Sequence, residues 1–468
     1  MSEELVRQLE PIFKATSVAI IGASKDQSKW GGRTLNRALE SGFRGPIYAV
    51  NPRETEIAGL KVYKDVQDIP DPVDLAVFTI PAELMPKAME SCVKKGVRGG
   101  VIISADFAET GAHGRELQEE TVRIAREGGI RFIGPNGNGM WTAAVNLNIS
   151  PLPTPAHGGL AFISQSGMFG GAAGRAAQLG GYGLSMFVSM GNQADITVAD
   201  YVEYLEQDDS TKVIALYVEG FKDGRRFAEI AKRVTQKKPI VILKGGRSSQ
   251  GARATLSHTA SIAGEDRVFD AMCKQTGLIR VYQLEHLWVA AQALLRLPIP
   301  RQGRVAIVGN GGENVVGVDT LVSLGLEVPE FHEEDKLALK EMLPPHAPIP
   351  QNPVDFAAGA FGCEEEVAVL EKMASLDNID AIITGPPRGQ SIHVRGLAEQ
   401  KKAVITALDQ FCKIPEKYGK PLLVRSMGTD SLTKEMLRAA KIPIFGSTEE
   451  CALAMSALYQ YGQIHRWD

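Results

Sequence analysis

Short apolar segments rich in β-branched residues recur along the whole chain, and most are followed by a segment of helical length. The first covers residues 17–22 and the second covers residues 46–52, with a helix expected near residues 31–42 between them. Buried strands that alternate with helices at this spacing are typical of parallel sheets covered on both faces. The pattern therefore predicts an α/β fold with Rossmann-like sheets.

The predicted strands form three series. The first series continues at residues 74–80, 100–104 and 131–135, the second covers 159–164, 184–189, 213–218 and 239–243, and the third covers 304–308, 381–384 and 421–425. Two prolines within residues 295–302 indicate a linker between the second and third series. We therefore expect three domains, at residues 1–150, 151–298 and 299–468.

Composition excludes several classes of protein. The chain has 468 residues, of which 44% are hydrophobic and 23% charged, and its formal net charge of −4 argues against binding to nucleic acid. The five cysteines show no C-x-x-C spacing, which argues against a zinc ribbon and favours reduced thiols. Neither an apolar signal core nor a run of about 18 apolar residues is present. These observations predict a soluble cytoplasmic protein without a membrane partner.

Two glycine-containing turns after predicted strands have the form of phosphate sites. Gly22 and Ser24 follow the first strand, and Lys29 lies just beyond them. Residues 164–171 (Ser-Gln-Ser-Gly-Met-Phe-Gly-Gly) form the second turn, where a helix would start with N–H groups pointing at an anion. A steric need for glycine explains the first turn about equally well, and an ordinary serine N-cap explains the second.

One histidine and one glutamate are candidates for chemistry. His258 lies among small and hydroxyl residues, in the stretch 251–264, and a histidine in such a setting can carry a phosphoryl group. Glu219 follows the strand at residues 213–218, at the end where parallel sheets bind ligands, and could stabilise a charged imidazole. The turns at residues 309–312 and 352–355 are interpreted as structural.

Taken together, these segments resemble the alpha subunit of the NDP-forming acyl-CoA synthetases, close to the ADP-forming acetate–CoA ligases and, more distantly, succinyl-CoA synthetase. The matching stretches are residues 22–24 (Gly-Ala-Ser), 47–52 (Ile-Tyr-Ala-Val-Asn-Pro), 73–77 (Val-Asp-Leu-Ala-Val), 134–136 (Gly-Pro-Asn), 163–167 (Ile-Ser-Gln-Ser-Gly), 188–195 (Val-Ser-Met-Gly-Asn-Gln-Ala-Asp), 217–220 (Tyr-Val-Glu-Gly), 257–259 (Ser-His-Thr) and 352–355 (Asn-Pro-Val-Asp). The resemblance implies a Rossmann-like CoA-binding domain followed by two flavodoxin-like parallel-sheet domains.

The resemblance also implies a phosphoryl relay. An acyl-CoA and inorganic phosphate give acyl phosphate and CoA, and the phosphoryl group passes to His258 and then to ADP; in reverse, ATP activates a small carboxylic acid. Glu219 would steady the phosphohistidine, and Asn136 would lie near the thiol end of CoA. The phosphate site would comprise Ser164, Gln165, Ser166 and Gly167, and the CoA site would comprise Gly22, Ser24, Lys29, Asn51, Pro52, Pro81 and Asn136. No metal site is expected on this chain.

A partner is expected because no ATP-grasp sequence follows the third series of strands, whereas some relatives carry one in the same chain. The resemblance implies an ATP-grasp beta subunit that binds ADP or ATP with Mg²⁺, in an α2β2 or similar assembly. Three positions depart from the family pattern: Ala260 replaces a glycine, Gly137 replaces a cysteine, and the pair at residues 106–107 is Asp-Phe instead of Gly-Phe. We expect the last two departures to reshape the acyl pocket, for an acid other than acetate.

Other functions are kept as alternatives. A non-catalytic CoA- or acyl-CoA-binding regulatory protein would have little need for His258, Glu219 and the turn at residues 164–167 together. An acetyltransferase accessory unit would require an acetyltransferase module, and none is visible. A nicotinamide dehydrogenase is disfavoured because the dinucleotide fingerprint is not recognisable.

Overall fold

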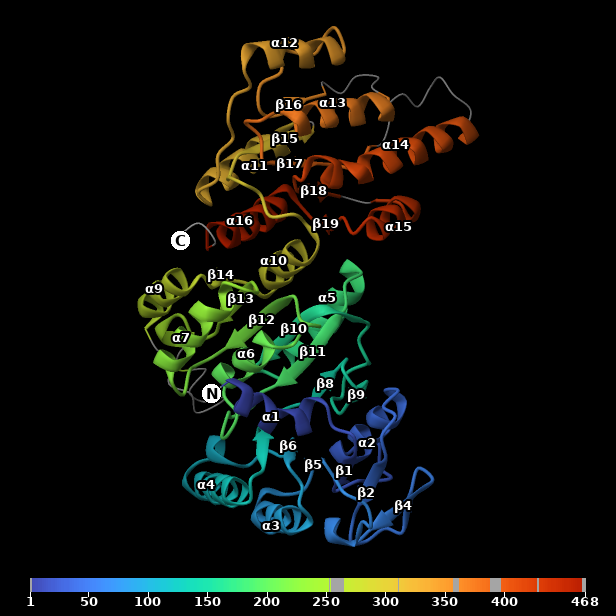
Figure 1. Cartoon of the computed structure of the whole chain (residues 1–468). Helices are drawn as coiled ribbons and strands as arrows, with labels where there is room; N and C mark the ends of the chain where they lie inside the picture. The colour runs from blue at the N-terminus through green and yellow to red at the C-terminus, as the bar shows by residue number, and fades with distance from the viewer. Residues whose placement is uncertain are drawn as a thin grey trace. The chain divides into compact units, whose positions relative to one another are not determined.

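A computed structural model describes residues 2–251, 253, 265–309, 311–356, 362–387, 397–426 and 429–464. The chain divides into two compact units, Met1–Tyr282 and Gln283–Asp468. Within the described residues the strands form three sheets, two in the first unit and one in the second (Figure 1). Most strand pairs are parallel, so the predicted α/β fold is confirmed.

The first sheet has the strand order of a Rossmann fold. Its strands are β1 (Val18–Ile21), β2 (Ile47–Val50), β3 (Glu56–Ile57), β4 (Leu60–Tyr63), β5 (Leu75–Phe78), β6 (Gly99–Ile102) and β7 (Arg131–Ile133). They lie in the order β3-β4-β2-β1-β5-β6-β7, and only β3, against β4, is antiparallel. The direction of winding therefore reverses between β1 and β5, where such sheets bind ligands.

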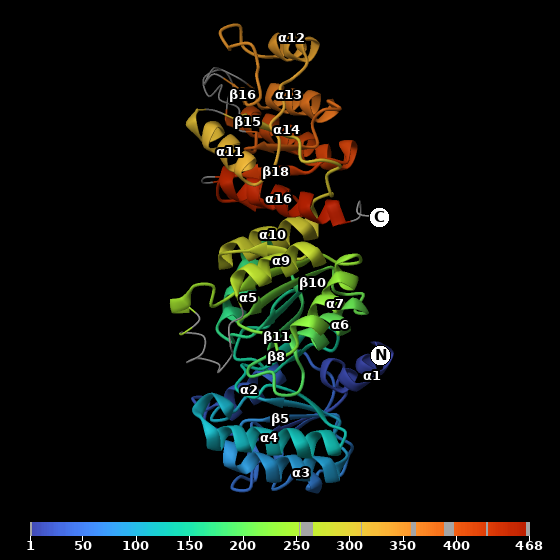
Figure 2. The same ribbon diagram turned by 90° about the vertical axis from the view of Figure 1, so that its left-hand side faces the viewer.

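Helices cover both faces of the first sheet. The helices are α1 (Ser2–Phe13), α2 (Trp30–Glu40), α3 (Met85–Lys95) and α4 (Ala112–Glu127), with 3₁₀ turns at η1 (Val66–Asp68), η2 (Ala82–Leu84) and η3 (Ala108–Thr110). Figure 2 shows α3 and α4 on the face away from the second sheet. All four residues of β1 are buried, as expected of a central strand enclosed on both faces.

The second sheet has a flavodoxin-like order. Its strands are β8 (Met140–Thr142), β9 (Leu147–Asn148), β10 (His157–Ser164), β11 (Leu184–Ser189), β12 (Val213–Val218), β13 (Ile240–Lys244) and β14 (Ile279–Val281), and its helices are α5 (Phe169–Gly180), α6 (Val198–Glu206), α7 (Gly224–Thr235) and α9 (Asp266–Thr276). The order is β14-β13-β12-β10-β11-β8-β9, and β8 pairs antiparallel with β11. The winding reverses between β10 and β12.

One hydrophobic core joins the first two sheets. It includes Leu9 and Phe13 of α1, residues of β1 and β10, and Tyr201 and Leu205 of α6, all of them buried. The ring of Phe13 lies 4.7 Å from that of Tyr204 and 6.2 Å from that of Tyr201. The two sheets are therefore fixed against each other within the first unit.

The second unit contains a smaller flavodoxin-like sheet. Its strands are β15 (Val305–Gly309), β16 (Val354–Asp355), β17 (Ala381–Thr384), β18 (Leu422–Arg425) and β19 (Ile444–Phe445), and its helices are α10 (Leu284–Arg296), α11 (Gly312–Ser323), α12 (Glu333–Met342), α13 (Cys363–Ser375), α14 (Leu397–Tyr418), α15 (Ser431–Ala439) and α16 (Thr448–Ile464). The parallel order β16-β15-β17-β18-β19 reverses between β15 and β17. Separate cores cover its two faces, one with α10, α11 and α16 and the other with α12, α13 and α14.

Some elements differ from the sequence-based prediction. The predicted linker at residues 295–302 starts inside α10, which ends at Arg296. The short strands β8, β9, β16 and β19 and the helix α1 were not predicted. Among the described residues, no helix is long and apolar enough to cross a lipid bilayer.

Candidate active site

The first half of the candidate site lies where the winding of the first sheet reverses. Gly22 follows β1, and Thr79 and Ile80 follow the neighbouring strand β5. Gly22 has a φ of +91°, and a Cβ atom built on it would lie 2.8 Å from both Thr79 Oγ1 and Ile80 Cγ2. Only glycine fits this position, so the turn after β1 can pass close to the end of β5.

The helix after this turn packs closely against it. A Cβ atom on Gly31, in the first turn of α2, would lie 1.9 Å from the carbonyl oxygen of Gly22. Ser24 Oγ accepts a hydrogen bond from Asp26 N at 3.1 Å, which shapes the connection. Lys29 is the exposed N-cap residue of α2. A cationic side chain therefore stands at a helix N-terminus, which is a suitable arrangement for an anion.

Asn51 links the end of β2 to the same turn. Its Nδ2 donates to Ala23 O at 2.8 Å, and its Oδ1 accepts from Arg53 N at 2.8 Å. Pro52 follows it, and Pro81 follows β5; both are exposed. The structure thus brings Gly22, Ser24, Lys29, Asn51, Pro52 and Pro81 to the carboxyl ends of three adjacent strands. Their role in binding CoA stays a prediction.

Residues 134–138 connect this half-site to the second sheet. Asn136 has a φ of +61°, and its N donates to Ser104 O, after β6, at 2.8 Å. Its Nδ2 lies 3.4 Å from Asn192 Oδ1, in the loop after β11, and Asn138 N donates to Ser189 Oγ at 2.8 Å. Asn136 therefore lies between the end of β6 and the loop that follows β11 of the second sheet.

The second half of the candidate site lies where the winding of the second sheet reverses. Gln165 follows β10, and Glu219 follows β12, the strand beside it. Gln165 Oε1 accepts from Glu219 N at 2.8 Å and from Gly220 N at 3.3 Å, and Gln165 N donates to Tyr217 O at 3.0 Å. The predicted phosphate turn and the predicted acid are thus in direct contact. In this geometry the backbone N–H of Gln165 faces β12.

The turn before α5 is tightly packed. Ser164 is fully buried, and its Oγ donates to Ser166 O at 2.6 Å, so this hydroxyl shapes the turn. A Cβ atom on Gly167 would lie 2.3 Å from Asn138 Cγ, which places the turn against the segment that carries Asn136. The start of α5 and residues 134–138 therefore adjoin, and phosphate binding at residues 164–167 stays a prediction.

Glu219 is buried, and a tyrosine of β12 donates a hydrogen bond to its carboxylate. It is 3% exposed, and its Oε1 accepts a hydrogen bond from Tyr217 Oη at 3.2 Å. Burial and the adjacent Glu219 carboxylate raise the pKa of Tyr217, which keeps the phenol protonated as a donor. Lys244, at the end of β13, is also buried, and its Nζ donates to the carbonyl oxygens of Gly245 and Gly246 at 3.3 and 3.4 Å. Burial lowers the pKa of Lys244.

His258 and Ala260 lie outside the described residues, so their positions relative to Glu219 are not part of the structure. The predicted role of His258 as phosphoryl carrier stays a prediction. Along the chain, β13 ends at Lys244 and α9 begins at Asp266, and the position of His258 falls between these two elements. Glu219 therefore follows the strand next to the one that precedes the stretch with His258.

Sequence reasoning missed Glu109, which lies near Asn136. Glu109 Oε1 accepts from Asp106 N at 2.8 Å and from Phe107 N at 3.1 Å, and its Oε2 accepts from Asn192 Nδ2 at 2.5 Å. Phe107 is fully buried in the core, whereas Asp106 is exposed and has a φ of +72°. Positions 106–107 were expected to reshape the acyl pocket. The Phe107 side chain instead contributes to the packing of the core, and Asp106 is the exposed residue of the pair.

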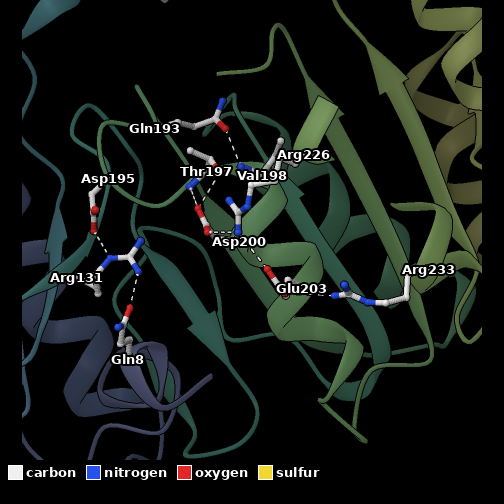
Figure 3. A network of polar contacts seen from close by, with 10 residues as sticks. All are labelled: Gln8, Arg131, Gln193, Asp195, Thr197, Val198, Asp200, Glu203, Arg226 and Arg233. Atoms are coloured by element: carbon white, nitrogen blue, oxygen red, sulfur yellow. Dashed lines mark hydrogen bonds and ion pairs between the residues drawn. The ribbon is translucent and has the colours of Figure 1, made fainter. Parts of the chain in front are cut away.

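Asp195, at the end of the stretch 188–195, ties the two sheets together (Figure 3). It is 4% exposed and accepts from Arg131 Nε at 2.8 Å and from Phe132 N at 3.0 Å, both on β7. Arg131 also donates to Gln8 of α1, at 2.9 Å. These bonds join a loop of the second sheet to the first sheet, so they help to hold the two halves of the candidate site in place.

The second unit contains a cavity of about 600 Å³ where the winding of its sheet reverses. It is lined by Gly309, Gly312 and Glu313 around the start of α11, and by Arg425 and Thr448 from β18 and α16. Arg425 Nη1 donates to Thr448 Oγ1 at 3.1 Å, and a Cβ atom on Gly309 would lie 2.0 Å from Arg425 Nη2. The glycine at residue 309 leaves room for the guanidinium of Arg425, a residue that sequence reasoning did not single out. The interpretation of the turn at residues 309–312 as structural stays a prediction.

Two family models match successive stretches of the chain. A CoA binding domain model matches residues 16–141, and a succinyl-CoA ligase like flavodoxin domain model matches residues 157–294. Acetate–CoA ligase [ADP-forming] II subunit alpha of Pyrococcus furiosus is 37% identical over 97% of both chains. The chain belongs to the family of ADP-forming acetate–CoA ligase alpha subunits.

Two further relatives differ in how much of their own length is matched. Acetate–CoA ligase [ADP-forming] I of Archaeoglobus fulgidus is 37% identical over 97% of this chain but only 64% of its own length. The structure of the dinucleotide forming acetyl-coenzyme A synthetase 1 of Candidatus Korarchaeum cryptofilum, in complex with phosphate and ADP, matches with a TM-score of 0.85 at 33% identity, over 98% of both chains. The family resemblance inferred from the sequence is confirmed.

Proposed function

We propose that the protein is the alpha subunit of an ADP-forming acyl-CoA synthetase, which interconverts acyl-CoA, ADP and phosphate with a carboxylic acid, CoA and ATP. The observation that carries this proposal is the identity of 37% to an ADP-forming acetate–CoA ligase alpha subunit over 97% of both chains. The geometry supports it, because the two places where ligands are expected in α/β sheets adjoin in the first unit through residues 134–138.

In the first step, an oxygen of inorganic phosphate attacks the thioester carbonyl, the C–S bond breaks, and CoA leaves as a thiolate that takes up a proton. The products are acyl phosphate and CoA. The start of α5, with Ser166 and Gly167, would bind the phosphate through backbone N–H groups, since phosphoryl chemistry depends chiefly on positioning and charge stabilisation. Asn136 would lie beside the thioester.

In the second step, an imidazole nitrogen of His258 attacks the phosphorus of acyl phosphate, and the P–O bond to the carboxylate breaks. The free acid leaves, and the histidine carries the phosphoryl group. Glu219 would stabilise the charged ring. In the third step, an oxygen of the β-phosphate of ADP attacks the same phosphorus, the N–P bond breaks, and ATP forms. A carrier divides one difficult transfer into two easier ones.

The residues of the first half-site fit CoA. The glycine turn admits the close approach of a phosphate-bearing ligand, and Lys29 at the start of α2 supplies positive charge. These residues all fall within the stretch matched by the CoA binding domain model. We assign the pyrophosphate of CoA to this turn and its thiol end to Asn136.

The third step requires a nucleotide site, which we assign to an ATP-grasp beta subunit that binds ADP or ATP with Mg²⁺. Two observations support a separate partner. The P. furiosus relative is named a subunit alpha and is matched over 97% of its length, whereas the A. fulgidus relative extends well beyond the match. An assembly of α2β2 or similar type follows from this proposal.

The test is labelling of the full chain with radioactive phosphate in the presence of a panel of acyl-CoAs. Wild type should acquire acid-labile label, His258→Ala should acquire none, and His113→Ala, which alters a side chain 76% exposed on α4, should label normally. Label that persists in His258→Ala would refute the relay. Wild type that binds CoA but never labels would favour the non-catalytic regulatory alternative.

The same panel tests the acyl specificity. Because Gly137 and Asp106 depart from the family pattern close to Asn136, we propose that an acid other than acetate is the preferred substrate. The most efficient labelling should then come from an acyl-CoA other than acetyl-CoA. Efficient labelling by acetyl-CoA above all others would contradict this.

A further inference from the structure

Tyr217 contacts three parts of the proposed site at once, although its own role is unassigned. It lies two residues before Glu219, and alternate residues of a strand face the same side of a sheet, so the phenol and the carboxylate are neighbours. Tyr217 Oη donates to Glu219 Oε1 at 3.2 Å. The hydroxyl is thus in place to fix one carboxylate oxygen.

The ring of Tyr217 is held by the first residue of α5. Its centroid lies 4.6 Å from that of Phe169, with an angle of 76° between the ring planes. This edge-to-face arrangement is a favoured geometry for aromatic pairs. The phosphate turn at residues 164–167 leads directly into Phe169, so the position of the phenol is coupled to the start of that helix.

The third contact is with the first residue after β13. A Cβ atom on Gly245 would lie 2.6 Å from Tyr217 Oη and 3.4 Å from Glu219 Cγ. Any larger residue at position 245 would push the phenol away from the carboxylate. The glycine therefore leaves room for the pair of Tyr217 and Glu219.

We propose that Tyr217 is a positioning residue, whose hydroxyl holds the carboxylate of Glu219 between the start of α5 and Gly245. This inference rests on the proposed function, in which Glu219 stabilises the phosphorylated histidine. In this role Tyr217 acts through Glu219. The raised pKa of the phenol agrees with a hydroxyl that remains a donor.

The first test compares Tyr217→Phe with wild type in the full chain. The ring and its contact with Phe169 remain, and only the hydroxyl is lost. With radioactive phosphate and a saturating concentration of the acyl-CoA that labels wild type best, the rate of histidine labelling should fall roughly tenfold, the effect of losing one hydrogen bond to a charged group. The KM for phosphate and the melting temperature should stay close to those of wild type.

Tyr48→Phe is the matched control. Tyr48 Oη donates to Asp71 Oδ2 at 3.0 Å in the first sheet, so this variant removes a hydrogen bond of the same kind outside the candidate site. Its labelling rate should equal that of wild type. If both variants label equally fast, or if both lose activity together with stability, the proposal is overturned.

A double-mutant cycle separates positioning from a general structural effect. Glu219→Asp keeps the charge but shortens the side chain by one methylene, which withdraws the carboxylate from the phenol. Tyr217→Phe should therefore change the labelling rate by less than about twofold in the Glu219→Asp background, since residues that act as one unit are non-additive. A full tenfold effect in that background means that Tyr217 acts independently of Glu219, and the proposal fails.

Failure of this inference can be told apart from failure of the proposed function. Wild type that labels on His258, together with a normal Tyr217→Phe variant, leaves the function standing and removes the role of Tyr217. Wild type that does not label with any acyl-CoA refutes the function and this inference with it.

Discussion

Gly22 illustrates how a single backbone position shapes the first half of the candidate site. Its left-handed conformation and its contacts with Thr79 and Ile80 leave no space for a side chain. Gly59 has a similar φ of +77°, but a Cβ atom there would meet nothing within 4 Å. A side chain at either position would thus be strained by the left-handed conformation, whereas only a side chain at position 22 would also clash with neighbouring residues.

We predict that Gly22→Ala weakens CoA binding far more than Gly59→Ala. Both variants carry backbone strain of about 1–2 kcal/mol, but only Gly22→Ala displaces the end of β5, at a further cost of about 1–3 kcal/mol. Isothermal titration with CoA should give a Kd at least roughly tenfold higher for Gly22→Ala than for wild type. Gly59→Ala is the control, and its Kd should stay close to that of wild type. Equal affinities of the two variants for CoA would count against CoA binding at the turn that contains Gly22.

At the residue scale, the sequence predicted side chains that lie at strand ends and missed those that depend on contacts between loops. Glu219 was singled out because it follows a parallel strand at the end where such sheets bind ligands, and Gln165 because it belongs to a glycine-containing turn at the start of a helix. The structure shows the two residues in contact. The contact of Glu109 with Asn192 joins residues 83 positions apart, which follow strands of different sheets. No local pattern specifies that pairing, because it arises only when the two sheets pack together. The position of His258 stays a prediction.

At the scale of secondary structure, interior elements were predicted well and edge elements poorly. The central strands are continuous β-branched runs, and burial on both faces makes such runs distinctive. β9, β16 and β19 have only two residues each, so their partners and not their own sequences decide their conformation. The helix α1 did carry a signal: Leu5, Leu9 and Ile12 are buried and lie at the spacing of one helical face.

The N-cap of α15 provides a prediction with a definite pH dependence. Asp430 accepts hydrogen bonds from Thr433 Oγ1 at 2.6 Å and from Thr433 N at 3.0 Å, and these bonds lower the pKa of Asp430. A group whose pKa is lower in the folded state stabilises that state above its unfolded pKa of about 4, and this contribution disappears as the pH falls through the lowered value. Asp430→Ala should therefore cost about 1 kcal/mol at pH 7 and progressively less below pH 4.

Hydrogen exchange of the α15 peptide is the appropriate measurement, because the effect is local. Asp430→Asn serves as the control, since its amide oxygen can still cap the helix but does not titrate. The difference between wild type and Asp430→Ala should shrink as the pH is lowered from 7 to 3, while the difference between Asp430→Asn and Asp430→Ala stays constant. A gap between wild type and the alanine variant that is independent of pH would contradict the assignment of the cap.

At the scale of the whole molecule, the three predicted domains and the two compact units divide the chain differently. The boundaries at residues 150 and 298 stay predictions, but the structure shows what a cut at residue 150 would sever. β8 would lose its antiparallel partner β11, and Arg131 would lose Asp195. Residues of α1 would lose the aromatic contacts of Phe13 with α6.

These losses predict that a fragment of residues 1–282 folds cooperatively, whereas a fragment of residues 1–150 does not. In the shorter fragment the core that joins the first two sheets is divided, so buried groups such as Phe13 and Leu9 become exposed and favour aggregation. Thermal melting by circular dichroism and binding of a hydrophobic dye distinguish the two fragments. A cooperative melt and low dye binding by residues 1–150 would show that the first sheet is stable without the second.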